Sequence, residues 1–490
     1  MTVPAAKLPS GVPGFDAVTR GGLPRGRLTL LEGARGTGKT IFALQVLAAG
    51  VEGGDGGAVF VAYDESPEAL RRAALDFGWD IAAWEREGRW AFVDGVPDPA
   101  QETVFAGDFD LGALIARIET AAVRTGARRV VLDSLDGLFA QLPPSPVVEN
   151  ELRRLAATLE SLDTTALFTA TPTFAEAVRG PRRVADGVIR LARGDDSESW
   201  ALAIEVETLR GAAHLSGRHP LVVVPGEGVA VLAPLGFEHE APAAERVPSG
   251  NPGLDRMMGG GPFRGSILLL QGPPGSGKSL LVAEFLAGGA GSGDRCALVT
   301  FKDGRARLVA EAAAFAIDME RMEADRRLAI VCARPGGAAL AEHLYLIQTI
   351  LDRFEPQRVA VAGLAELARI AGPRLLAQGF AYLTALLRQR GVTGLLAWPD
   401  RRVLGGDELE AQLATAADAV IALRDEDDGG ERLRLIDVLK VRGSWHERGP
   451  RAYAIDGDGF HVGRPWRVGR ASEHEPSDDR HAADPARDLV

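Results

Sequence analysis

Cysteine is scarce in this sequence, with only two among 490 residues, Cys296 and Cys332. Both lie in apolar, strand-like runs, and neither has a second ligand at the spacing of a metal site. These observations exclude a disulfide-stabilised secreted scaffold and a zinc-binding module. We interpret both cysteines as small hydrophobic residues of the interior.

Long apolar runs are also missing. No stretch approaches the length of about 18 residues that marks a membrane-spanning helix. Residues 1–10 show no secretory signal peptide. We therefore expect a cytoplasmic protein that neither inserts into a membrane nor is exported.

Basic charge is in deficit, since 55 Lys and Arg face 67 Asp and Glu and the formal net charge is -12. Nonspecific affinity for nucleic acid comes from neutralising phosphates with basic side chains. The acidic balance, together with the lack of a basic stretch interleaved with aromatic residues, counts against a nucleic-acid partner.

Lysine is rarer still, because arginine fills nearly every basic position. The five lysines are Lys7, Lys39, Lys278, Lys302 and Lys440. Where arginine is the default, a lysine indicates a place that requires a compact ammonium. Two of the five close glycine-rich loops, and this makes Lys440 a further candidate functional residue.

Residues 28–40 read LTLLEGARGTGKT, a short apolar run followed by a glycine loop that ends in Lys39-Thr40. The pattern predicts a strand, a phosphate-binding loop and a helix over 41–50. Backbone N–H groups of such a loop wrap a polyphosphate, the lysine reaches the β- and γ-phosphates, and the hydroxyl of Thr40 holds Mg²⁺. The alternative is an ordinary glycine turn into a helix.

A second copy favours the phosphate loop, since residues 267–279 read ILLLQGPPGSGKS. The segment upstream of each loop is repeated as well, from Ser10-Gly11 and from Ser249-Gly250. We predict that nucleotide is bound by Gly33, Gly36, Thr37, Gly38, Lys39 and Thr40 in the first copy and by Gly272, Gly275, Ser276, Gly277, Lys278 and Ser279 in the second. Ser279 is the predicted counterpart of Thr40 as a metal ligand.

The first half alternates predicted strands and helices: strand 58–62, helix 67–77, strand 90–93, helix 111–125 and strand 129–132. This order is typical of a parallel sheet with crossover helices. Beyond Leu162 we predict an antiparallel extension of the sheet, with strands at 165–169, 187–192, 200–209 and 221–224.

The repeat also predicts the domain boundaries. Residues 186–189 and 209–214 recur as 418–421 and 441–446, both at an offset of 232. Proline and alanine accumulate at 234–246, where one copy passes into the next. We predict domains at 1–240 and 241–470, followed by a disordered tail at 471–490, which has almost no large apolar residues.

Carboxylates at two strand ends complete the first candidate site. The strand 129–132 ends in Asp133, which we predict to hold Mg²⁺ with Thr40; a surface turn cap is the alternative. The strand 58–62 runs into Asp64-Glu65, and we predict Glu65 as the general base that orients the attacking water, with Asp64 assisting. Solvated carboxylates before a helix cap are the alternative.

Several segments together resemble one family, the circadian-clock ATPase KaiC of the RecA superfamily. They are GFDAVTRGGLPRGRLTLLEGARGTGKT at 14–40, SGNPGLDRMMGGGPFRGSILLLQGPPGSGKS at 249–279, FGWD at 77–80 and KVRGSWH at 440–446. The resemblance covers roughly residues 10–470 and implies an α/β chain of two tandem RecA-like P-loop NTPase domains, with mainly parallel central sheets and antiparallel extensions. It also implies a double ring of six chains with ATP and Mg²⁺ between neighbouring subunits, a first domain that is an ATPase, and a second that acts on an adjacent Ser-Thr pair as kinase and phosphatase.

The second half departs from this family pattern in three places. Ala362-Gly363 stands where the family has the metal-binding Asp and a Ser, Lys302-Asp303 stands for a Glu pair, and Ala414-Thr415 stands for the phosphorylated pair. Phosphoryl transfer by the second domain is therefore doubtful, whereas its phosphate loop is whole. We expect this domain to bind ATP without consuming it.

The family's interface cations are partly kept. In the first half Arg210 is present, but Thr208 replaces the family's lysine; in the second half both Lys440 and Arg442 remain. The resemblance implies that these side chains act on a neighbour's nucleotide, so we predict Arg210 as a catalytic residue and Lys440 and Arg442 as nucleotide ligands.

The predicted function is that of a ring-forming ATPase, a homo-oligomer of six chains, which hydrolyses ATP slowly in its first domain. Three alternatives stay open. They are a signalling scaffold that uses ATP to bind an unknown protein partner, a residual serine/threonine autokinase, and a recombinase-like ATPase on DNA.

Overall fold

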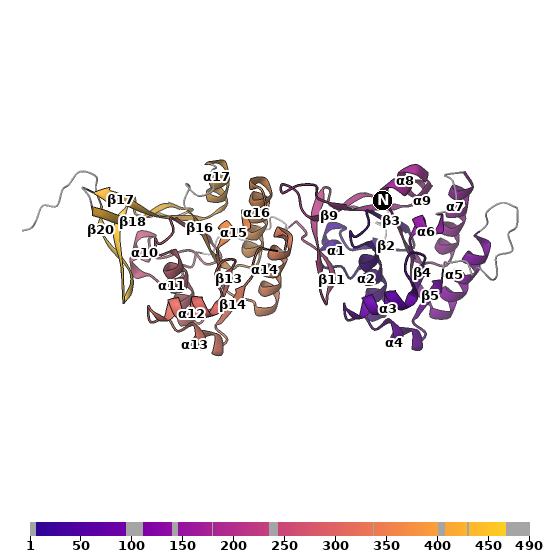
Figure 1. Cartoon of the computed structure of the whole chain (residues 1–490), viewed down its shortest axis with the longest axis horizontal. Helices are drawn as coiled ribbons and strands as arrows, with labels where there is room; N and C mark the ends of the chain where they lie inside the picture. The colour runs from indigo at the N-terminus through magenta and orange to yellow at the C-terminus, as the bar shows by residue number, and fades with distance from the viewer. Residues whose placement is uncertain are drawn as a thin grey trace, which may run out of the picture.

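The computed structural model describes residues 6–94, 111–139, 146–178, 180–234, 244–336, 338–399, 407–428 and 431–466. They form two α/β units that lie side by side along the long axis of the molecule, each with a nine-stranded sheet (Figure 1). A short antiparallel pair, β1 (Lys7–Leu8) with β2 (Leu23–Pro24), lies outside both sheets.

The first sheet has the strand order β11-β10-β9-β8-β3-β7-β6-β4-β5. Its strands are β3 (Leu28–Gly33), β4 (Gly57–Ala62), β5 (Trp90–Asp94), β6 (Ala127–Asp133), β7 (Thr165–Ala170), β8 (Gly187–Arg193), β9 (Leu202–Leu209), β10 (Arg218–Val224) and β11 (Gly228–Val231). The pairs from β5 to β8 are parallel and those from β8 to β11 antiparallel. Every residue of β3, β4 and β7 is buried, as expected for parallel strands covered on both faces.

The second sheet repeats this topology in the order β14-β13-β15-β16-β12-β17-β18-β19-β20. Its strands are β12 (Ile267–Gly272), β13 (Cys296–Thr300), β14 (Leu328–Cys332), β15 (Arg358–Ala362), β16 (Thr393–Pro399), β17 (Ala419–Asp428), β18 (Glu431–Val441), β19 (Arg451–Asp456) and β20 (Gly459–Pro465). The phosphate-loop strand is central in both sheets, β3 in the first and β12 in the second.

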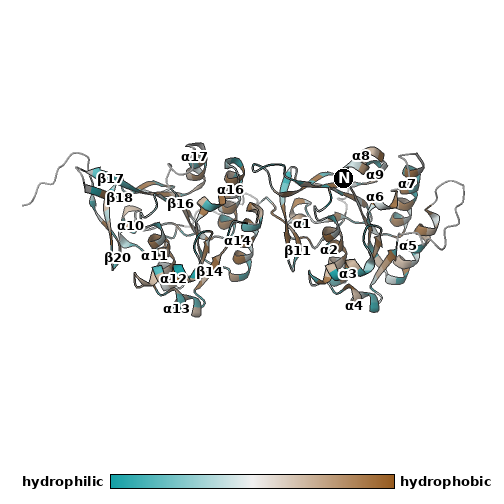
Figure 2. Ribbon diagram, viewed as in Figure 1, coloured by the Kyte–Doolittle hydropathy of each residue, from teal (hydrophilic) through white to brown (hydrophobic). Residues whose placement is uncertain are grey.

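Helices cover both sheets. In the first unit they are α1 (Phe15–Val18), α2 (Lys39–Glu52), α3 (Pro67–Leu75), α4 (Ile81–Arg86), α5 (Gly112–Thr125), α6 (Leu135–Leu138), α7 (Pro146–Ser161), α8 (Pro172–Val178) and α9 (Gly180–Val184). In the second they are α10 (Pro252–Met257), α11 (Lys278–Gly291), α12 (Arg305–Ala313), α13 (Met319–Ala324), α14 (Leu340–Phe354), α15 (Leu364–Leu367), α16 (Pro373–Gln389) and α17 (Asp407–Ala416). Apolar residues concentrate along the sheets and the inner faces of these helices (Figure 2).

The predicted fold class, two tandem RecA-like α/β domains with antiparallel extensions, is confirmed. One strand was placed wrongly: residues 165–169 belong to β7, which is a central strand parallel to both β3 and β6, not part of the antiparallel extension. The helices α8 and α9 connect β7 to β8 and allow the parallel crossover, and the sequence prediction had no helix there.

Two further expectations have different outcomes. Cys296 is buried as predicted, but Cys332 is exposed, because it is the last residue of the edge strand β14. The predicted domain boundary between 240 and 241 and the predicted tail 471–490 lie outside the described residues, so both stay predictions.

The antiparallel edge of the first unit packs against the second unit. Val222, Ala230 and Leu232 are buried in one hydrophobic cluster with residues of α14 and α16. At the margin of this contact, Glu227 accepts a hydrogen bond of 2.9 Å from the hydroxyl of Tyr345. The hairpin β10–β11 therefore connects the first unit to the helices that cover the second sheet.

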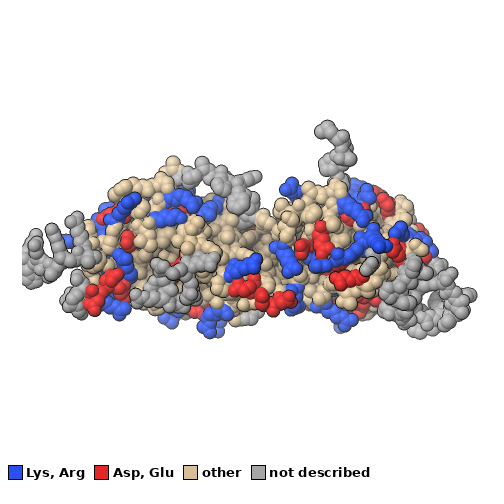
Figure 3. All heavy atoms as spheres, turned by 90° about the horizontal axis from the view of Figure 1, so that it is seen from above, with Lys and Arg blue, Asp and Glu red and all other residues tan. Residues whose placement is uncertain are grey.

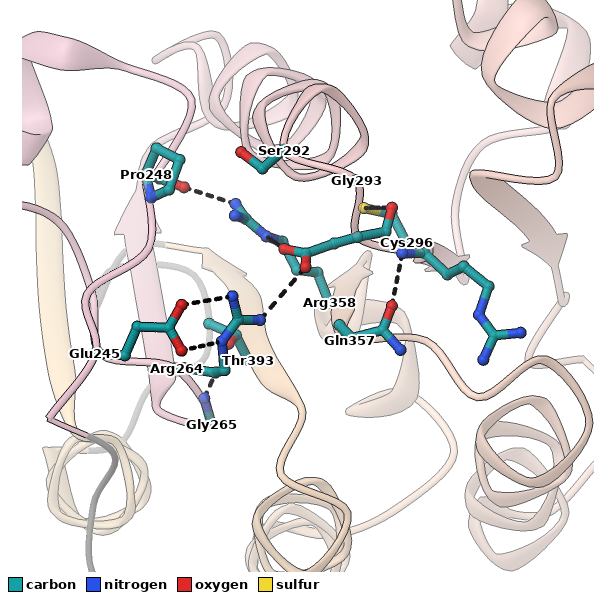
Figure 4. Close-up of polar contacts among 12 residues, drawn as sticks. Glu245, Pro248, Arg264, Gly265, Ser292, Gly293, Cys296, Gln357, Arg358 and Thr393 are labelled. Carbon is teal, nitrogen blue, oxygen red and sulfur yellow. Dashed lines mark hydrogen bonds and ion pairs between the residues drawn. The ribbon is translucent and has the colours of Figure 1, made fainter.

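A buried arginine fixes the start of the second unit (Figure 4). Arg358, at the first position of β15, is fully buried, and its Nε donates to Asp294 at 2.7 Å while its Nη1 donates to the carbonyl of Pro248 at 2.6 Å. Arg264 joins Asp294 at 3.3 Å and Glu245 at 2.8 Å. These contacts hold the segment that leads from the first unit to β12 against the second sheet.

The surface carries both signs of charge. On the face drawn in Figure 3, Lys and Arg lie interspersed with Asp and Glu over both units. Within the described ranges, no helix has the length and the apolar composition that crossing a membrane requires.

Candidate functional site

The two glycine loops have the same structure at the carboxyl ends of β3 and β12. Each ends in a glycine with φ of 91°, Gly38 or Gly277, a left-handed conformation that a residue with a Cβ rarely adopts. The next residue is Lys39 or Lys278, which begins the long helix α2 or α11. The amino end of each helix therefore lies at the loop, where its dipole favours an anion.

The predicted loop residues come together in both units. Lys39 Nζ lies 2.7 Å from the carbonyl oxygen of Gly33, and Lys278 Nζ lies 2.5 Å from that of Gly272. Gly36 and Gly275 have φ of 74° and 79°. Thr37 and Ser276 are buried beneath the loops, and the Thr37 hydroxyl donates to Ala34. The geometry of both loops fits a polyphosphate.

The candidate metal site of the first unit is built on Asp133, at the end of β6. One carboxylate oxygen accepts a hydrogen bond of 2.8 Å from the hydroxyl of Thr40, the first-turn residue of α2. The other accepts a hydrogen bond from the hydroxyl of Thr169, near the end of the adjacent strand β7. Three elements therefore fix one carboxylate beside the phosphate loop.

The electrostatics of Asp133 fit a bound cation. Only 4% of the residue is exposed, and this burial raises the pKa of its carboxyl, while the hydrogen bonds from Thr169 and Thr40 oppose the rise. A hydroxyl and a carboxylate are oxygen donors of the kind that Mg²⁺ prefers, and Mg²⁺ takes its remaining ligands from phosphates and water. Among the described residues no group of three His, Cys, Asp or Glu could hold a metal by itself. The donor set therefore fits Mg²⁺ that is bound together with a nucleotide.

The same charges act on the loop lysine. Burial lowers the pKa of Lys39, and the carboxylates of Asp133, Asp136 and Asp64 oppose this by favouring the ammonium form. The lysine therefore lies close enough to these carboxylates to share their field, which is consistent with one compact site.

The two candidate base residues differ in their contacts. Asp64 accepts a hydrogen bond of 2.6 Å from the hydroxyl of Ser134, which fixes its position. Glu65 is exposed and its carboxylate makes no hydrogen bond with the described residues. Desolvation, and then the charges of Asp133 and Asp64, raise the pKa of Glu65. A free carboxylate whose pKa is raised is the better proton acceptor, and this favours Glu65 as the base.

Sequence reasoning missed the hydroxyl groups around these carboxylates. They are Thr169 and Ser134, together with Thr171, which donates its backbone N–H to Asp136 at 2.8 Å. The only signal was a polar residue at the end of an apolar strand. Because 165–169 was assigned to the antiparallel extension, Thr169 was not expected beside Asp133.

The predicted basic residues lie at one end of the strands of each sheet, and the phosphate loop of the same chain lies at the other end. The backbone N–H of Arg210 donates to Asp186 at 2.8 Å, and β9 ends with Leu209 beside Gly187, the first residue of β8. That end of the sheet is the amino end of β3, whereas the loop follows its carboxyl end. A strand rises about 3.3 Å per residue, so the length of β3 separates these two ends by roughly 15 Å. The fold therefore does not bring Arg210 to the loop of its own chain.

Lys440 and Arg442 lie at the corresponding end of the strands in the second sheet. Lys440 Nζ donates to the carbonyls of Ala414 and Ala417 at 2.9 and 2.7 Å. Arg442 Nη2 donates to the carbonyl of Thr415 at 3.3 Å. Both basic side chains thus hold the end of α17 and lie away from residues 272–279.

Thr415 itself is exposed near the carboxyl end of α17, and its hydroxyl donates to the carbonyl of Ala411 at 2.7 Å. This is an ordinary contact of a helical threonine with the preceding turn. The position lies on the Lys440 side of the sheet, so it is remote from the phosphate loop of its own chain.

The second unit lacks the carboxylate that organises the first. Ala362 ends β15 where Asp133 ends β6, and Ser279, the counterpart of Thr40, is exposed. Lys302 and Asp303 follow β13 where Asp64 and Glu65 follow β4. The donor set of this unit fits a polyphosphate at the loop but not the Mg²⁺ site of the first unit.

Comparison with known proteins agrees with the duplicated architecture. The family model described as "ATPase: KaiC" matches residues 8–236 and 247–466. "Circadian clock protein KaiC3" of Synechocystis sp. is 39% identical over 467 residues, which are 94% of this chain and 92% of that protein. "Circadian clock oscillator protein KaiC" of Thermostichus vulcanus is 36% identical over 94% of this chain and 90% of that protein, and that of Prochlorococcus marinus is 34% identical over 97% of each.

Proposed function

The chain belongs to the KaiC family of ATPases, and on this premise we propose that its first domain, residues 1–240, hydrolyses ATP while its second, residues 241–470, binds ATP without hydrolysing it. The observation that carries the proposal is the contrast between Asp133 and Ala362. The first is a buried carboxylate hydrogen-bonded to Thr40 at 2.8 Å, and the second is its counterpart without any charge.

In the first domain each residue has a separate task. Backbone N–H groups of residues 33–38 and the ammonium of Lys39 bind the phosphates, while Thr40 and Asp133 hold the metal. Bound Mg²⁺ supplies positive charge to the phosphate oxygens. Glu65 orients a water molecule toward the γ-phosphate and takes its proton. Desolvation raises the pKa of Glu65, and the charges of Asp133 and of Asp64, which Ser134 holds in place, add to the rise.

Arg210 acts on the nucleotide of a neighbouring subunit in this proposal. Its position at the far edge of the sheet supports that role, because roughly 15 Å along the strands separate it from the loop of its own chain. A cation supplied to the γ-phosphate in trans accelerates hydrolysis by about 10³–10⁵. With Thr208 in place of a second cation, turnover is slow.

The second domain keeps ATP as a structural or regulatory ligand. Its loop matches the first in φ values and in the position of the lysine, and Lys440 and Arg442 provide basic groups toward a neighbour. A kinase reaction at Thr415 is not part of the proposal, because Ala362 replaces the metal-binding carboxylate, Lys302 replaces the assisting carboxylate, and the shorter Asp303 stands at the position of the base.

A signalling role is the second candidate function. Three relatives are named circadian clock proteins, which supports an output through a protein partner whose binding depends on the nucleotide state. The packing of the hairpin β10–β11 against α14 and α16 supports it too, since it offers a direct physical connection between the two domains. A pull-down in ATP and in ADP tests whether any partner is bound in a nucleotide-dependent way.

Glu65→Gln tests the assignment of hydrolysis. It removes the proton acceptor and leaves the phosphate loop intact, so turnover should fall at least about 100-fold while ATP binding stays within a factor of about three. Phosphate release and equilibrium ATP binding are the two measurements. Glu68→Gln is the matched control, because Glu68 is an exposed residue of α3 whose ion pair among the described residues is with Arg71 at 3.7 Å. Turnover at the parental rate in Glu65→Gln would exclude Glu65 as the base.

A further inference from the structure

The second domain carries a lysine at a strand end where the first carries an acid. In the first sheet, Ala62 lies beside Asp133 and the backbone N–H of Tyr63 donates to the carbonyl of Asp133 at 2.9 Å. In the second sheet, Thr300 lies beside Ala362. Asp64 is the second residue after β4, and Lys302 is the second residue after β13.

The backbone around Lys302 shows that this is the same position in the fold. The N–H of Phe301 donates to the carbonyl of Ala362 at 3.0 Å, as Tyr63 does to Asp133. The turn after the strand is held by the hydroxyl of Thr300, which accepts from the N–H of Lys302 at 3.3 Å. The N–H of Asp303 donates to the same hydroxyl at 3.4 Å, so the backbone is held on both sides of the Cα of Lys302.

Gly363 gives the lysine stem its space. A Cβ at Gly363 would lie 3.0 Å from the Cβ of Lys302 and 3.0 Å from its backbone nitrogen. The first domain has Ser134 at this position, whose hydroxyl binds Asp64. The replacement of serine by glycine accompanies the replacement of the acid by lysine, and it removes the hydroxyl that holds the acid in the first domain.

The carboxylates near this edge are already paired. Asp303 lies 3.7 Å from Arg307 of α12, and Glu366 lies 3.5 Å from Arg369. Lys302 is exposed, and its ammonium makes no hydrogen bond or ion pair with any residue that the structure describes. Among the described charged groups at these strand ends, the ammonium of Lys302 is therefore unpaired and can contact a ligand.

We propose that the ammonium of Lys302 takes the place of Mg²⁺ in the second domain, so that this domain binds ATP without a divalent cation. The inference rests on the proposed function, in which the second domain binds ATP. It identifies the group that neutralises the phosphate charge in the second domain, where Ala362 stands at the position of Asp133.

The charges at the strand ends of the two domains support the replacement of Mg²⁺ by the ammonium of Lys302. The first domain places three carboxylates at the strand ends, Asp64, Glu65 and Asp133, and a triphosphate beside them requires a divalent cation. In the second domain the equivalent positions hold Lys302, Asp303 and Ala362, whose formal charges cancel. A lysine on a flexible stem is a mobile point charge that donates three hydrogen bonds to phosphate oxygens. An ammonium is also a weaker electrophile than a metal ion, which agrees with binding in the absence of hydrolysis.

The test measures ATP binding to the full chain in Mg²⁺ and in EDTA. Lys39→Ala serves as the background, because it removes the phosphate lysine of the first loop and leaves the second loop as the tight site. Equilibrium dialysis with labelled ATP should give one site per chain, with an affinity that changes less than about threefold when EDTA replaces Mg²⁺, a difference below 1 kcal/mol by the usual conversion.

Variants of Lys302 assign the effect to the ammonium. Lys302→Met should lower the affinity in EDTA at least about tenfold, the loss expected for one charge-assisted contact, whereas Lys302→Arg should retain most of it. Arg305→Met is the matched control, because the guanidinium of Arg305 is engaged by Glu323 of α13 at 3.0 Å and should contribute nothing.

The outcomes separate the two proposals. If the second loop binds ATP in Mg²⁺ but loses it in EDTA, or if Lys302→Met binds as tightly as the parent, the substitution of lysine for the metal is wrong while ATP binding by this domain stands. If no ATP is bound in either buffer and Lys278→Ala changes nothing, the proposed function of the second domain is wrong as well.

Discussion

At the scale of single residues, the two candidate sites differ at two strand ends: Ala362 replaces Asp133, which accepts hydrogen bonds from two threonine hydroxyls, and Lys302 replaces Asp64. Asp133 was predictable because a carboxylate after an apolar strand accompanies a phosphate loop. Thr169 was not, since a threonine in a strand has many uses and only strand order brings it to Asp133. The exposed position of Cys332 was unpredictable for the same reason: its strand reads as interior, but the sheet places it at an edge.

A buried histidine leads to a prediction about pH. His343 of α14 is 4% exposed, its ring packs edge-on against Phe301 at 5.2 Å between centroids, and its Nε2 has no partner among the described residues. Burial lowers the pKa of His343, so the folded state binds a proton less readily than the unfolded chain. The contribution of His343 to stability should therefore be complete above the ordinary histidine pKa of 6.5 and be lost as the pH falls below it.

The measurement is the melting temperature between pH 8 and pH 5, in steps of about half a unit around the ordinary pKa of histidine. His343→Leu keeps an apolar side chain of similar bulk and removes the titration, so its melting temperature should depend less on pH than that of the parent. Some dependence should remain, because burial also lowers the pKa of His219. Equal pH profiles of parent and variant would contradict the assignment to His343.

At the scale of helices and strands, most elements of the first half were predictable from hydrophobic periodicity and their ends lie close to those expected. The strand expected at 58–62 is Gly57–Ala62 and the helix expected at 111–125 is Gly112–Thr125. Strand neighbours were not predictable in the same way, because an apolar run fits a parallel or an antiparallel partner equally well. The assignment of 165–169 failed for this reason.

Arg358, which begins β15, is an element-scale feature, because it joins this strand to Asp294 in the loop after α11 and to the incoming chain at Pro248. Its pair with Asp294 is almost fully buried, with side-chain exposures of 0% and 10%. Asp294→Ala should destabilise the second domain by about 3–5 kcal/mol, since it leaves a buried guanidinium without its counter-charge.

Denaturant unfolding measures the effect. Asp325→Ala is the matched control, because Asp325 pairs with Arg321 at 3.8 Å on the surface, where removal of a pair costs about 1 kcal/mol or less. If both variants lose the same amount of stability, the buried pair is not a structural requirement. The counterpart pair of the first domain, Arg129 with Asp55 at 2.8 Å, is more exposed on its acidic side, so its loss should cost less.

At the scale of the whole molecule, the duplication was readable from the sequence but the contact between the copies was not. Val222, Ala230 and Leu232 read as ordinary strand residues, yet they are buried against helices that begin more than 100 residues later. The same hairpin contacts the phosphate-loop helix, since Gln45 of α2 exchanges hydrogen bonds of 3.2 and 2.8 Å with the backbone of Val229. No local pattern encodes a surface whose partner lies in another domain.

The prediction at the scale of the whole molecule concerns the assembly of several chains into a ring. Because Arg210 and Arg442 lie on the edge opposite to the loops, we expect them to act between chains, so that ATP with Mg²⁺ favours a hexamer. Light scattering should give a mass of about six chains with nucleotide, and Arg442→Ala should shift the distribution toward smaller species by removing a contact that an arginine makes with phosphate.

Arg321→Ala is the control for this experiment, since the Arg321 side chain is 80% exposed on α13 and its ion pair within the described ranges is with Asp325 on the surface. A monomeric mass with and without nucleotide would contradict the expected ring, whatever the variants do.

The buried hairpin β10–β11 also fixes which half of the tandem repeat comes first. At the edge of the first sheet, Ala230 of β11 and the following Leu232 are buried against the helices of the second unit, whereas most of β20, at the equivalent edge of the second sheet, is open to solvent. The copies can therefore no longer exchange places: a gene with its halves in reverse order would encode an apolar end and a polar joint.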